Sequence, residues 1–337
     1  MIQQNVSLKP YNTFGIDATA EQFAAFRSVD ELYQLLNFKP LYSEKLLILG
    51  GGSNLLFTEH FKGLVLKNDS KGIETIEEDE EHIFIKVAAG ESWHRFVLFC
   101  LQNNYAGVEN LSLIPGNVGA SPMQNIGAYG VEIKDVFHEL QAFHIGDKIV
   151  KTFSLEECSF GYRESVFKQA YKNQFVILNV TFRLNKKPRF HTTYGVINKE
   201  LENMGVQELS IHAISQAIIN IRSSKLPDPS MLGNAGSFFK NPLIETKEFE
   251  ELKSRFPDIV SFPAGEGLTK LAAGWLIEQC GWKGYREGDA GCYQKQALVL
   301  VNYGNVQGKQ IYELSEKIIL SVKNKFGVVL EREVNII

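Results

Sequence analysis

The sequence has few cysteines, no long apolar run and no excess of positive charge. The four cysteines, Cys100, Cys158, Cys280 and Cys292, are far apart and show no C-x-x-C spacing. This pattern predicts neither a disulfide framework nor a zinc site, and it fits a reducing cytoplasm, the location that we expect. The net charge of -4 argues against a nucleic-acid-binding protein, which usually carries a basic excess.

Signals for secretion or membrane insertion are also missing. The first residues, Met1-Ile2-Gln3-Gln4-Asn5, do not form a basic stretch followed by an apolar one, so we expect no secretory signal. The longest window without a charged side chain, residues 110–131, contains two prolines and four glycines. A membrane helix needs roughly 20 predominantly apolar residues, so this window is predicted to be a loop. We therefore expect no contact with a membrane.

The residues that are present predict a mixed α+β protein. With 337 residues, 44% apolar and 22% charged, the chain is typical of a globular protein of two or three domains. Apolar patterns predict strands at 46–49, 64–66, 83–87, 175–184, 297–301 and 328–337, and helices at 91–104, 211–221, 268–276 and 311–322. Gly281 and Gly327 suit helix C-caps. The segment Lys225-Leu226-Pro227-Asp228-Pro229 would end a helix, which indicates a domain boundary near residue 222.

A glycine-rich turn directly follows the first of these strands, with the sequence Gly50-Gly51-Gly52-Ser53-Asn54-Leu55. Glycine lets backbone N–H groups approach phosphate oxygens, and the serine and asparagine add donors. The turn is not a Rossmann fingerprint, because leucine stands at the third glycine position and no room is left for a crossover helix. Taken alone, it fits either a phosphate-binding loop or an ordinary glycine turn.

A second loop, residues 113–130, is rich in small and neutral polar residues. Small residues keep Cβ atoms out of the way, while serine, asparagine and glutamine supply uncharged hydrogen bonds. Such a segment can surround a bulky planar ligand without placing a full charge against it. Long irregular loops in compact domains are more often functional than idle, but a packed connection between two strands remains the alternative.

One arginine stands out beside a tyrosine, in the segment Phe160-Gly161-Tyr162-Arg163-Glu164. The planar guanidinium pairs with carboxylate or phosphate in a bidentate manner. The alternative is a surface arginine paired with a neighbour such as Glu164.

Two further candidates are less distinctive. Ser237 lies in a small-residue turn, 233–242, where its hydroxyl would fit a helix cap or a turn as well as a catalytic role. With no nearby histidine and no G-x-S-x-G motif, a hydrolase nucleophile is not indicated. Glu333 alternates with Glu331 and Asn335, a pattern typical of a solvated strand face. The residues alone therefore predict a ligand-binding protein of two domains and assign no reaction.

Six segments in this order resemble the UDP-N-acetylenolpyruvoylglucosamine reductases, flavoproteins of the vanillyl-alcohol-oxidase superfamily. The segments are 12–15, 50–54, 114–130, 161–163, 233–242 and 330–337. The resemblance covers residues 11–337, and the segment 190–195 is similar to a tyrosine loop that one of the two family subtypes carries. Each motif is weak by itself, and their number and order make the resemblance specific.

The resemblance implies a fold and a reaction. The expected fold is α+β, with a two-part FAD-binding domain of the vanillyl-alcohol-oxidase type at 1–222, whose lobes meet near residue 68. A smaller α+β substrate-binding domain follows at 223–326, and a C-terminal strand at 327–337 carries Glu333. The implied reaction is NADPH-dependent reduction of UDP-N-acetylglucosamine enolpyruvate to UDP-N-acetylmuramate through FAD, a step of peptidoglycan precursor synthesis. No second dinucleotide motif is visible, which agrees with one site used in turn by NADPH and substrate.

The resemblance also implies roles for single residues. Arg163 and Glu333 match the pair that flanks the enolpyruvyl carboxylate, and Ser237 matches the proton donor. Substrate-binding positions are Tyr162, Tyr194, Lys225, Asn241 and Gln296, and Lys240 is a further candidate for the diphosphate. Cofactor-binding positions are Gly50, Gly51, Gly52, Ser53, Asn54, Leu55, Pro115, Gly116, Gly119, Ala120, Ser121, Gln124, Asn125, Ile126, Gly127 and Ala128. No metal is implied.

Three further expectations concern the cofactor, the oligomer and the alternatives. Neither loop contains histidine or cysteine, so FAD is expected to be bound without a covalent link. The only partners expected are the cofactors and the UDP-sugar substrate, and the protein is expected to be a monomer. Two rival functions are a flavin oxidase or dehydrogenase of the same superfamily and a nucleotide-sugar-binding protein without a redox role.

Overall fold

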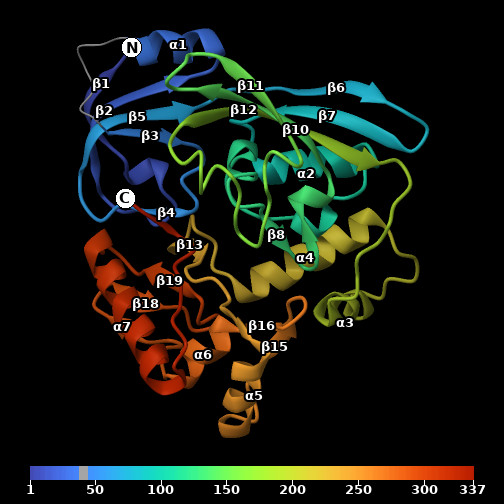
Figure 1. Cartoon of the computed structure of the whole chain (residues 1–337), viewed down its shortest axis with the longest axis vertical. Coiled ribbons are helices and arrows are strands. Elements are labelled where there is room, and N and C mark those ends of the chain that lie inside the picture. Colours follow the sequence, from blue (N-terminus) through green and yellow to red (C-terminus); the bar gives the residue numbers. More distant parts are fainter. Residues whose placement is uncertain (38–44) are drawn as a thin grey trace. The chain divides into compact units, whose positions relative to one another are not determined.

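The computed structural model describes residues 1–37 and 45–337, which form two compact units (Figure 1). The first unit comprises Met1–Val6, Ala20–Gly51 and Lys62–Ser224, and the second comprises Ser7–Thr19, Gly52–Phe61 and Lys225–Ile337. The short segments Ser7–Thr19 and Gly52–Phe61 thus belong with the C-terminal part of the chain. The consecutive division expected at residues 222 and 326 stays a prediction.

The first unit begins with a sheet whose strands lie in the order β1-β2-β5-β3. These strands are β1 (Gln3–Ser7), β2 (Thr19–Phe26), β5 (Phe61–Asn68) and β3 (Leu46–Leu49), and helix α1 (Val29–Asn37) packs against them through Leu32 and Leu36. The predicted strands at 46–49 and 64–66 are confirmed. Because β3 runs parallel to β5, the chain leaves both strands at the same edge of the sheet. That edge carries the glycine-rich turn.

The larger sheet of the first unit is antiparallel and has the strand order β11-β10-β12-β7-β6. Its strands are β6 (Ile73–Glu78), β7 (His82–Ala88), β10 (Phe137–His144), β11 (Val150–Ser154) and β12 (Phe175–Asn185). Helix α2 (Trp93–Gln102) lies on one face, where the Phe96 ring stacks on Phe182 with centroids 4.7 Å apart (Figure 1). The strands predicted at 83–87 and 175–184 and the helix predicted at 91–104 are confirmed, with small shifts of their ends.

Two helices, α3 (Gly195–Asn203) and α4 (Ile211–Lys225), form a separate apolar cluster in the first unit. The isoleucines at 214, 218 and 221 lie on the buried face of α4, as their spacing predicted. The helix continues through Lys225, whereas the sequence predicted that it stops before this residue. Only Pro227, two residues further, cannot continue a helix, so the last turn forms before the break.

The second unit is built from short strands and three helices. A four-stranded sheet has the order β13-β19-β18-β17 and a three-stranded sheet the order β14-β16-β15. The strands are β13 (Gly233–Ser237), β14 (Leu243–Glu245), β15 (Ser261–Pro263), β16 (Leu268–Leu271), β17 (Arg286–Glu287), β18 (Ala290–Cys292) and β19 (Val299–Asn302), and the helices are α5 (Thr246–Arg255), α6 (Ala273–Gln279) and α7 (Gly308–Phe326). Throughout the described ranges, no helix combines the length and the apolar content that crossing a bilayer requires.

The helix predicted at 268–276 is wrong in its first half. Leu268–Leu271 forms β16, which pairs with β14 and β15, and α6 begins only at Ala273. Within β16, Thr269 and Leu271 are buried while Leu268 is exposed, so the buried positions alternate as in a strand. The leucine spacing fitted both structures, and pairing with two neighbouring strands decided between them. Cys280 is the C-cap of α6, and Gly281, directly after it, has φ of 81°, the left-handed conformation that ends many helices.

The closing strand predicted at 328–337 is wrong over most of its length. Only Asn335–Ile336 forms a strand, β20, parallel to β4 (Leu55–Leu56). The residues before it form no strand, and their backbone is paired at single points, such as the bridge between Arg332 and Phe239. Helix α7 ends at Gly327, whose φ of 78° confirms the predicted C-cap.

Candidate active site

The glycine-rich turn after β3 contacts the 113–130 loop within the first unit. A Cβ atom on Gly51 would lie 2.8 Å from Gly116 Cα and 2.9 Å from Asn117 Oδ1, closer than any real Cβ contact. The two backbones therefore meet with no side chain between them. A glycine is required at Gly52 as well, because its φ is 63° and a Cβ would lie 1.9 Å from the Tyr11 carbonyl oxygen.

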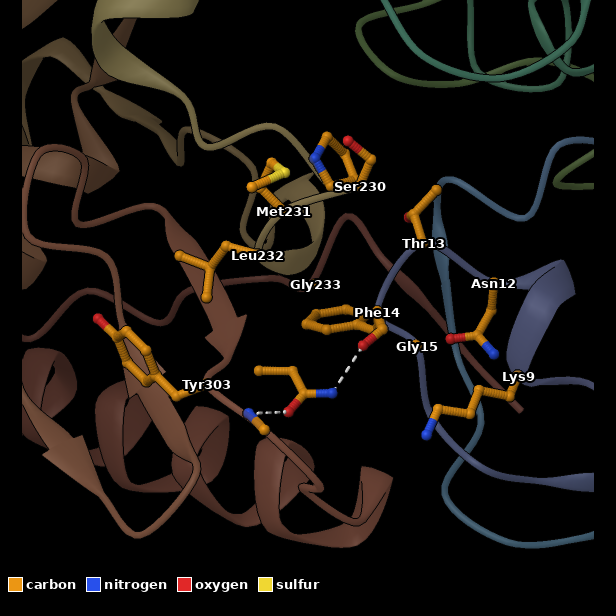
Figure 2. Close-up of a pocket in the computed structure, with 13 residues that line it drawn as sticks. Lys9, Asn12, Thr13, Phe14, Gly15, Ser230, Met231, Leu232, Gly233 and Tyr303 are labelled. Carbon is orange, nitrogen blue, oxygen red and sulfur yellow. Dashed lines mark hydrogen bonds between the residues drawn. The ribbon is translucent and has the colours of Figure 1, made fainter.

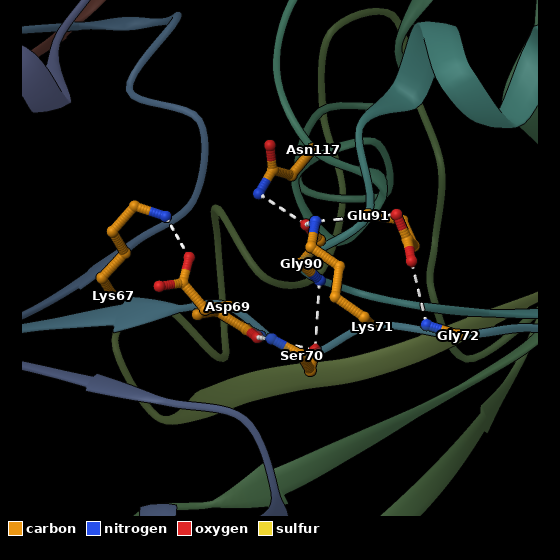
Figure 3. Close-up of polar contacts among 9 residues, drawn as sticks. Lys67, Asp69, Ser70, Lys71, Gly72, Gly90, Glu91 and Asn117 are labelled. Atoms are coloured by element: carbon orange, nitrogen blue, oxygen red, sulfur yellow. Dashed lines mark hydrogen bonds and ion pairs between the residues drawn. The ribbon is translucent and has the colours of Figure 1, made fainter.

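The 113–130 loop is held against the segment that leads into α2. The Val118 N–H donates to Glu91 O at 2.8 Å, and the Gly119 N–H donates to Ala89 O at 2.9 Å. Figure 3 shows the polar contacts behind this attachment, in which Asn117 Nδ2 donates to Gly90 O at 3.2 Å. The Glu91 carboxylate in turn accepts from the Gly72 N–H at 2.9 Å (Figure 3). The loop is therefore fixed to the segment between β7 and α2, which is itself bonded to the residue before β6.

The expected cofactor-binding positions in this loop fall into two groups. Ser121 and Asn125 are buried, and their side chains bond to protein groups. The others are small or neutral and at least partly exposed: Pro115, Gly116, Gly119, Ala120, Gln124, Ile126, Gly127 and Ala128. These residues form a surface from which few large side chains project, and the glycine-rich turn beside it has no room for Cβ atoms. Such a surface fits a flat cofactor that carries a pyrophosphate. The residues present thus fit FAD.

Arg163 lies at the tip of a tight turn, residues 161–164, beside the same loop. The turn is closed by two hydrogen bonds between the backbones of Gly161 and Glu164, at 3.1 and 3.3 Å, and Arg163 has φ of 57°. One guanidinium nitrogen of Arg163 donates to Gly127 O at 2.8 Å. The guanidinium carbon lies 5.3 Å from the centroid of the Tyr162 ring. The expected carboxylate-binding arginine is therefore attached to the expected flavin-lining loop.

Ser237 and Glu333 lie on neighbouring backbones of the second unit. The Glu333 N–H donates to Phe238 O at 2.8 Å, next to the serine at the end of β13. Glu333 is partly buried, whereas Glu331 and Asn335 are exposed, so the solvated-face interpretation does not hold for Glu333. The position of Glu333 is set by a backbone hydrogen bond to Phe238, a residue distant in the sequence. The residues next to Glu333 in the sequence do not indicate this contact. The predicted meeting of Ser237 and Glu333 with Arg163 of the first unit stays a prediction.

The expected substrate-binding residues of the second unit already have protein partners. Asn241 Oδ1 accepts from the Ala273 N–H at 2.9 Å, where α6 begins, and Gln296 Oε1 accepts from the Leu298 N–H at 3.3 Å. Lys225 is exposed at the end of α4. Lys240 is almost fully buried, and its ammonium group lies 2.6 Å from the exposed Glu331 carboxylate. Its positive charge is therefore partly compensated within the protein.

Arg222 is a partly buried cation to which no sequence pattern pointed. Its guanidinium bonds to the Tyr129 hydroxyl, and its Nε has no partner among the described residues. Burial lowers the pKa of Arg222 and raises that of Tyr129. The Tyr129 ring also meets the expected substrate residue Tyr194 edge-on, with centroids 5.8 Å apart. In the sequence, the one feature that marks Arg222 is its position directly after the apolar stripe of α4.

A separate pocket of about 580 Å³ lies in the second unit (Figure 2). Its lining is residues 9, 12–15, 229–233 and 302–304, and it includes none of the expected site residues. In its lining, Asn302 Nδ2 donates to Phe14 O at 2.8 Å. The buried side chain of Asn12 donates to Leu8 O and Ile16 O at 2.8 and 3.0 Å. The motif at 12–15 therefore has a structural task, joining distant segments of this unit.

Models of two protein families match the chain. One, for the C-terminal domain of UDP-N-acetylenolpyruvoylglucosamine reductase, matches residues 228–337, and the other, for an FAD binding domain, matches residues 20–152. Among solved structures, UDP-N-acetylenolpyruvylglucosamine reductase from Thermus caldophilus is 24% identical with a TM-score of 0.70, covering 100% of this chain and 99% of that one. These matches confirm the expected α+β fold with an FAD-binding domain.

Full-length relatives give the family. The UDP-N-acetylenolpyruvoylglucosamine reductase of Amoebophilus asiaticus is 51% identical over 336 residues, which are 100% of this chain and 99% of the relative. The reductase of the same name from Flavobacterium johnsoniae is 50% identical over 337 residues, again 100% and 99% of the two chains. That of Pseudomonas syringae pv. tomato is 49% identical over 335 residues, covering 99% and 98%. The chain belongs to the UDP-N-acetylenolpyruvoylglucosamine reductase family.

Proposed function

We propose that this chain reduces UDP-N-acetylglucosamine enolpyruvate to UDP-N-acetylmuramate, with NADPH as the electron donor and FAD as the bound cofactor. Relatives of about half identity along the whole chain carry the name of this reductase. The observation in the structure that carries the proposal is Arg163, held by Gly127 O beside the loop expected to line the flavin. Bound FAD supplies hydride transfer in both directions, from the nicotinamide and to the substrate.

Three protein residues carry out the other steps of the reaction. Reduction of the enolpyruvyl double bond places negative charge on the carbon that bears the carboxylate, and this charge spreads into the carboxylate. Arg163 binds the carboxylate and stabilises the charge, because its planar fork matches two oxygens at once. The Ser237 hydroxyl donates a proton to the carbon, which completes the saturated lactyl ether. Glu333 orients the groups around this carboxylate.

Binding of the ligands is assigned to the remaining expected residues. The 50–55 turn holds the FAD pyrophosphate with its backbone N–H groups, and the 115–128 segment lines the flavin. Tyr162, Tyr194, Lys225, Asn241 and Gln296 bind the UDP-sugar. The ammonium of Lys225 is exposed and supplies local positive charge for a diphosphate, in a chain of net charge -4.

We also place the protein in the cytoplasm, as a monomer without nucleic-acid or membrane partners. All four cysteines are free, as a reducing compartment requires. The negative net charge gives no electrostatic footprint for a nucleic acid.

The proposed reaction predicts two separable half-reactions. The purified protein should show the absorbance bands of bound flavin, and anaerobic NADPH should bleach them. Addition of the enolpyruvyl UDP-sugar should then restore the oxidised spectrum in one turnover and yield UDP-N-acetylmuramate. Rapid reoxidation by oxygen alone would indicate a flavin oxidase, and a colourless protein that binds UDP-sugar would indicate a binding protein. Either result would refute the reductase function.

The attachment of FAD gives a second prediction. Neither the 50–55 turn nor the 113–130 loop contains a histidine or cysteine that could bond to the flavin, and Cys100 and Cys158 of the first unit are buried. Precipitation with acid should therefore release all flavin into the supernatant, where mass spectrometry should find unmodified FAD. A precipitate that stays yellow and fluorescent after washing would show a covalent link and contradict the assignment.

A further inference from the structure

Three hydrogen bonds join the 113–130 loop to the segment that carries Arg163. Ser165 Oγ donates to Met123 O at 2.7 Å, and Asn125 Nδ2 donates to Gly161 O at 3.1 Å. The third is the bond from the Arg163 guanidinium to Gly127 O at 2.8 Å. On the loop side the bonds fall on every second residue, so the two segments are joined along a continuous line.

Asn125 occupies the central position of this line and is fully buried. Its second amide hydrogen goes to Glu132 Oε2 at 2.9 Å, and its Oδ1 accepts from the Lys134 N–H at 3.2 Å. Both donors and the acceptor of the side-chain amide are thus used within the protein. Because no donor of the amide is left over, the side chain is committed to holding protein groups rather than a ligand.

The partner of this amide is fixed as well. The Glu132 carboxylate that receives the Asn125 amide also accepts from Lys134 Nζ at 2.9 Å. Glu132 and Asp135 form a reciprocal capping box around the 3₁₀ turn η4 (Ile133–Asp135). Asn125 therefore connects the 161–164 turn to an anchored carboxylate.

The residue type at this position fits the task. Asn125 has φ of 45°, a left-handed conformation that asparagine adopts more readily than most residues. A glutamine would place its amide one carbon further out, and an aspartate would lose both N–H donors. The position needs a short side chain with two donors on a left-handed backbone.

We propose that Asn125 is a positioning residue for Arg163. By holding Gly161 O, the amide fixes the base of the turn at whose tip the guanidinium lies. The guanidinium bond to Gly127 O alone fixes one end of a long side chain, and the amide fixes the backbone from which that side chain starts. This role rests on the proposed function, because it is measured as the rate of flavin reoxidation by substrate, the step in which Arg163 binds the substrate carboxylate.

A double-mutant cycle with the flavin-loaded protein tests the proposal. With Asn125→Ala saturated with FAD, flavin reoxidation by substrate should slow by about 10-fold more than flavin reduction by NADPH, as expected for a misplaced group. In the Arg163→Met background the same change should cost less than about 2-fold, since a residue that acts through Arg163 cannot act when it is gone. Single-turnover stopped-flow absorbance measures both rates.

Ser165→Ala is the matched control. It removes another hydrogen bond between the same two segments, but from a residue just outside the 161–164 turn. Reoxidation in Ser165→Ala should stay within about 3-fold of wild type, and the comparison with Asn125→Ala isolates the position of the lost bond. Equal slowing in both variants would overturn the proposal in favour of a general attachment of the loop.

Two further outcomes would also overturn it. If Asn125→Ala slows reoxidation equally in the wild-type and Arg163→Met proteins, Asn125 acts independently of Arg163. If both Asn125→Ala and Asn125→Gly lose FAD, the residue holds the cofactor loop itself. The glycine variant can still be tested if the alanine variant does not fold, because glycine adopts positive φ without strain. Failure of the proposed function is separate, since it would show as wild-type flavin that the enolpyruvyl substrate does not reoxidise.

Discussion

Ser237→Ala is expected to bind FAD and to be bleached by NADPH at nearly the wild-type rate. Reoxidation by the enolpyruvyl UDP-sugar should slow by at least about 100-fold, the usual scale for a lost general acid. Ser237 ends β13 and pairs with Val299, and alanine keeps this backbone while it removes only the hydroxyl. Anaerobic stopped-flow absorbance of the flavin, with NADPH and substrate added in separate experiments, measures the two half-reactions.

A serine of the same unit provides the control for this result. Ser230 is exposed, and its hydroxyl bonds to Asp228 at 2.8 Å, so Ser230→Ala removes a hydroxyl without reaching the proposed chemistry. Both half-reactions of this variant should match wild type. Ser237→Cys, which restores a proton donor, should recover part of the lost rate. Equal slowing of both half-reactions in Ser237→Ala would contradict the role as proton donor.

Helices and strands could be predicted from the sequence wherever burial determines which positions are apolar. The apolar run of β3 forms a partly buried strand and the long apolar stretch of β12 a largely buried one, and their composition indicates strands directly. The isoleucine stripe of α4 predicted a helix for the same reason. In these elements the buried residues contact the core through their own side chains, so the information is local.

The sequence predicted the secondary structure less well where pairing with distant strands determines it. Leu268–Leu271 forms β16 because β14 and β15 lie on either side, although the leucine spacing fits a helix. In the segment after Gly327 only β20 finds a partner strand, β4, which lies more than 250 residues away in the chain. Such pairings depend on the whole fold, and the residues of the segment do not encode them.

The candidate site shows the same division. Two glycines of the 50–55 turn are required by the backbone, Gly51 by its approach to Gly116 and Gly52 by its positive φ, so composition alone pointed to the turn. Glu333 could be chosen only through a family resemblance, since its place beside Phe238 comes from a backbone contact with a distant segment. Arg222 was missed because a single charge at the end of an apolar helix stripe is indistinguishable, by pattern, from a surface residue.

Replacement of Arg163 gives the second large effect. Arg163→Met is expected to retain FAD and NADPH reduction within a few-fold, but to slow reoxidation by the enolpyruvyl substrate by about 10²–10³-fold. Loss of one preorganised group that stabilises transition-state charge typically costs about 3–4 kcal/mol, which corresponds to this range. Arg163 has φ of 57°, and methionine inherits the same strained backbone as arginine, so little added destabilisation is expected. Thermal unfolding of the variant would check that the rate loss is not a folding defect.

Arg163→Lys separates charge from geometry. A lysine keeps the positive charge but lacks the planar fork, so it cannot hold Gly127 O and present two parallel donors to a carboxylate. Its reoxidation rate should therefore lie between those of Arg163→Met and wild type. If lysine matched wild type, charge alone would suffice, and the anchoring of the guanidinium by the 113–130 loop would have no catalytic meaning. If methionine matched wild type, the carboxylate of the substrate would have to be bound by another cation.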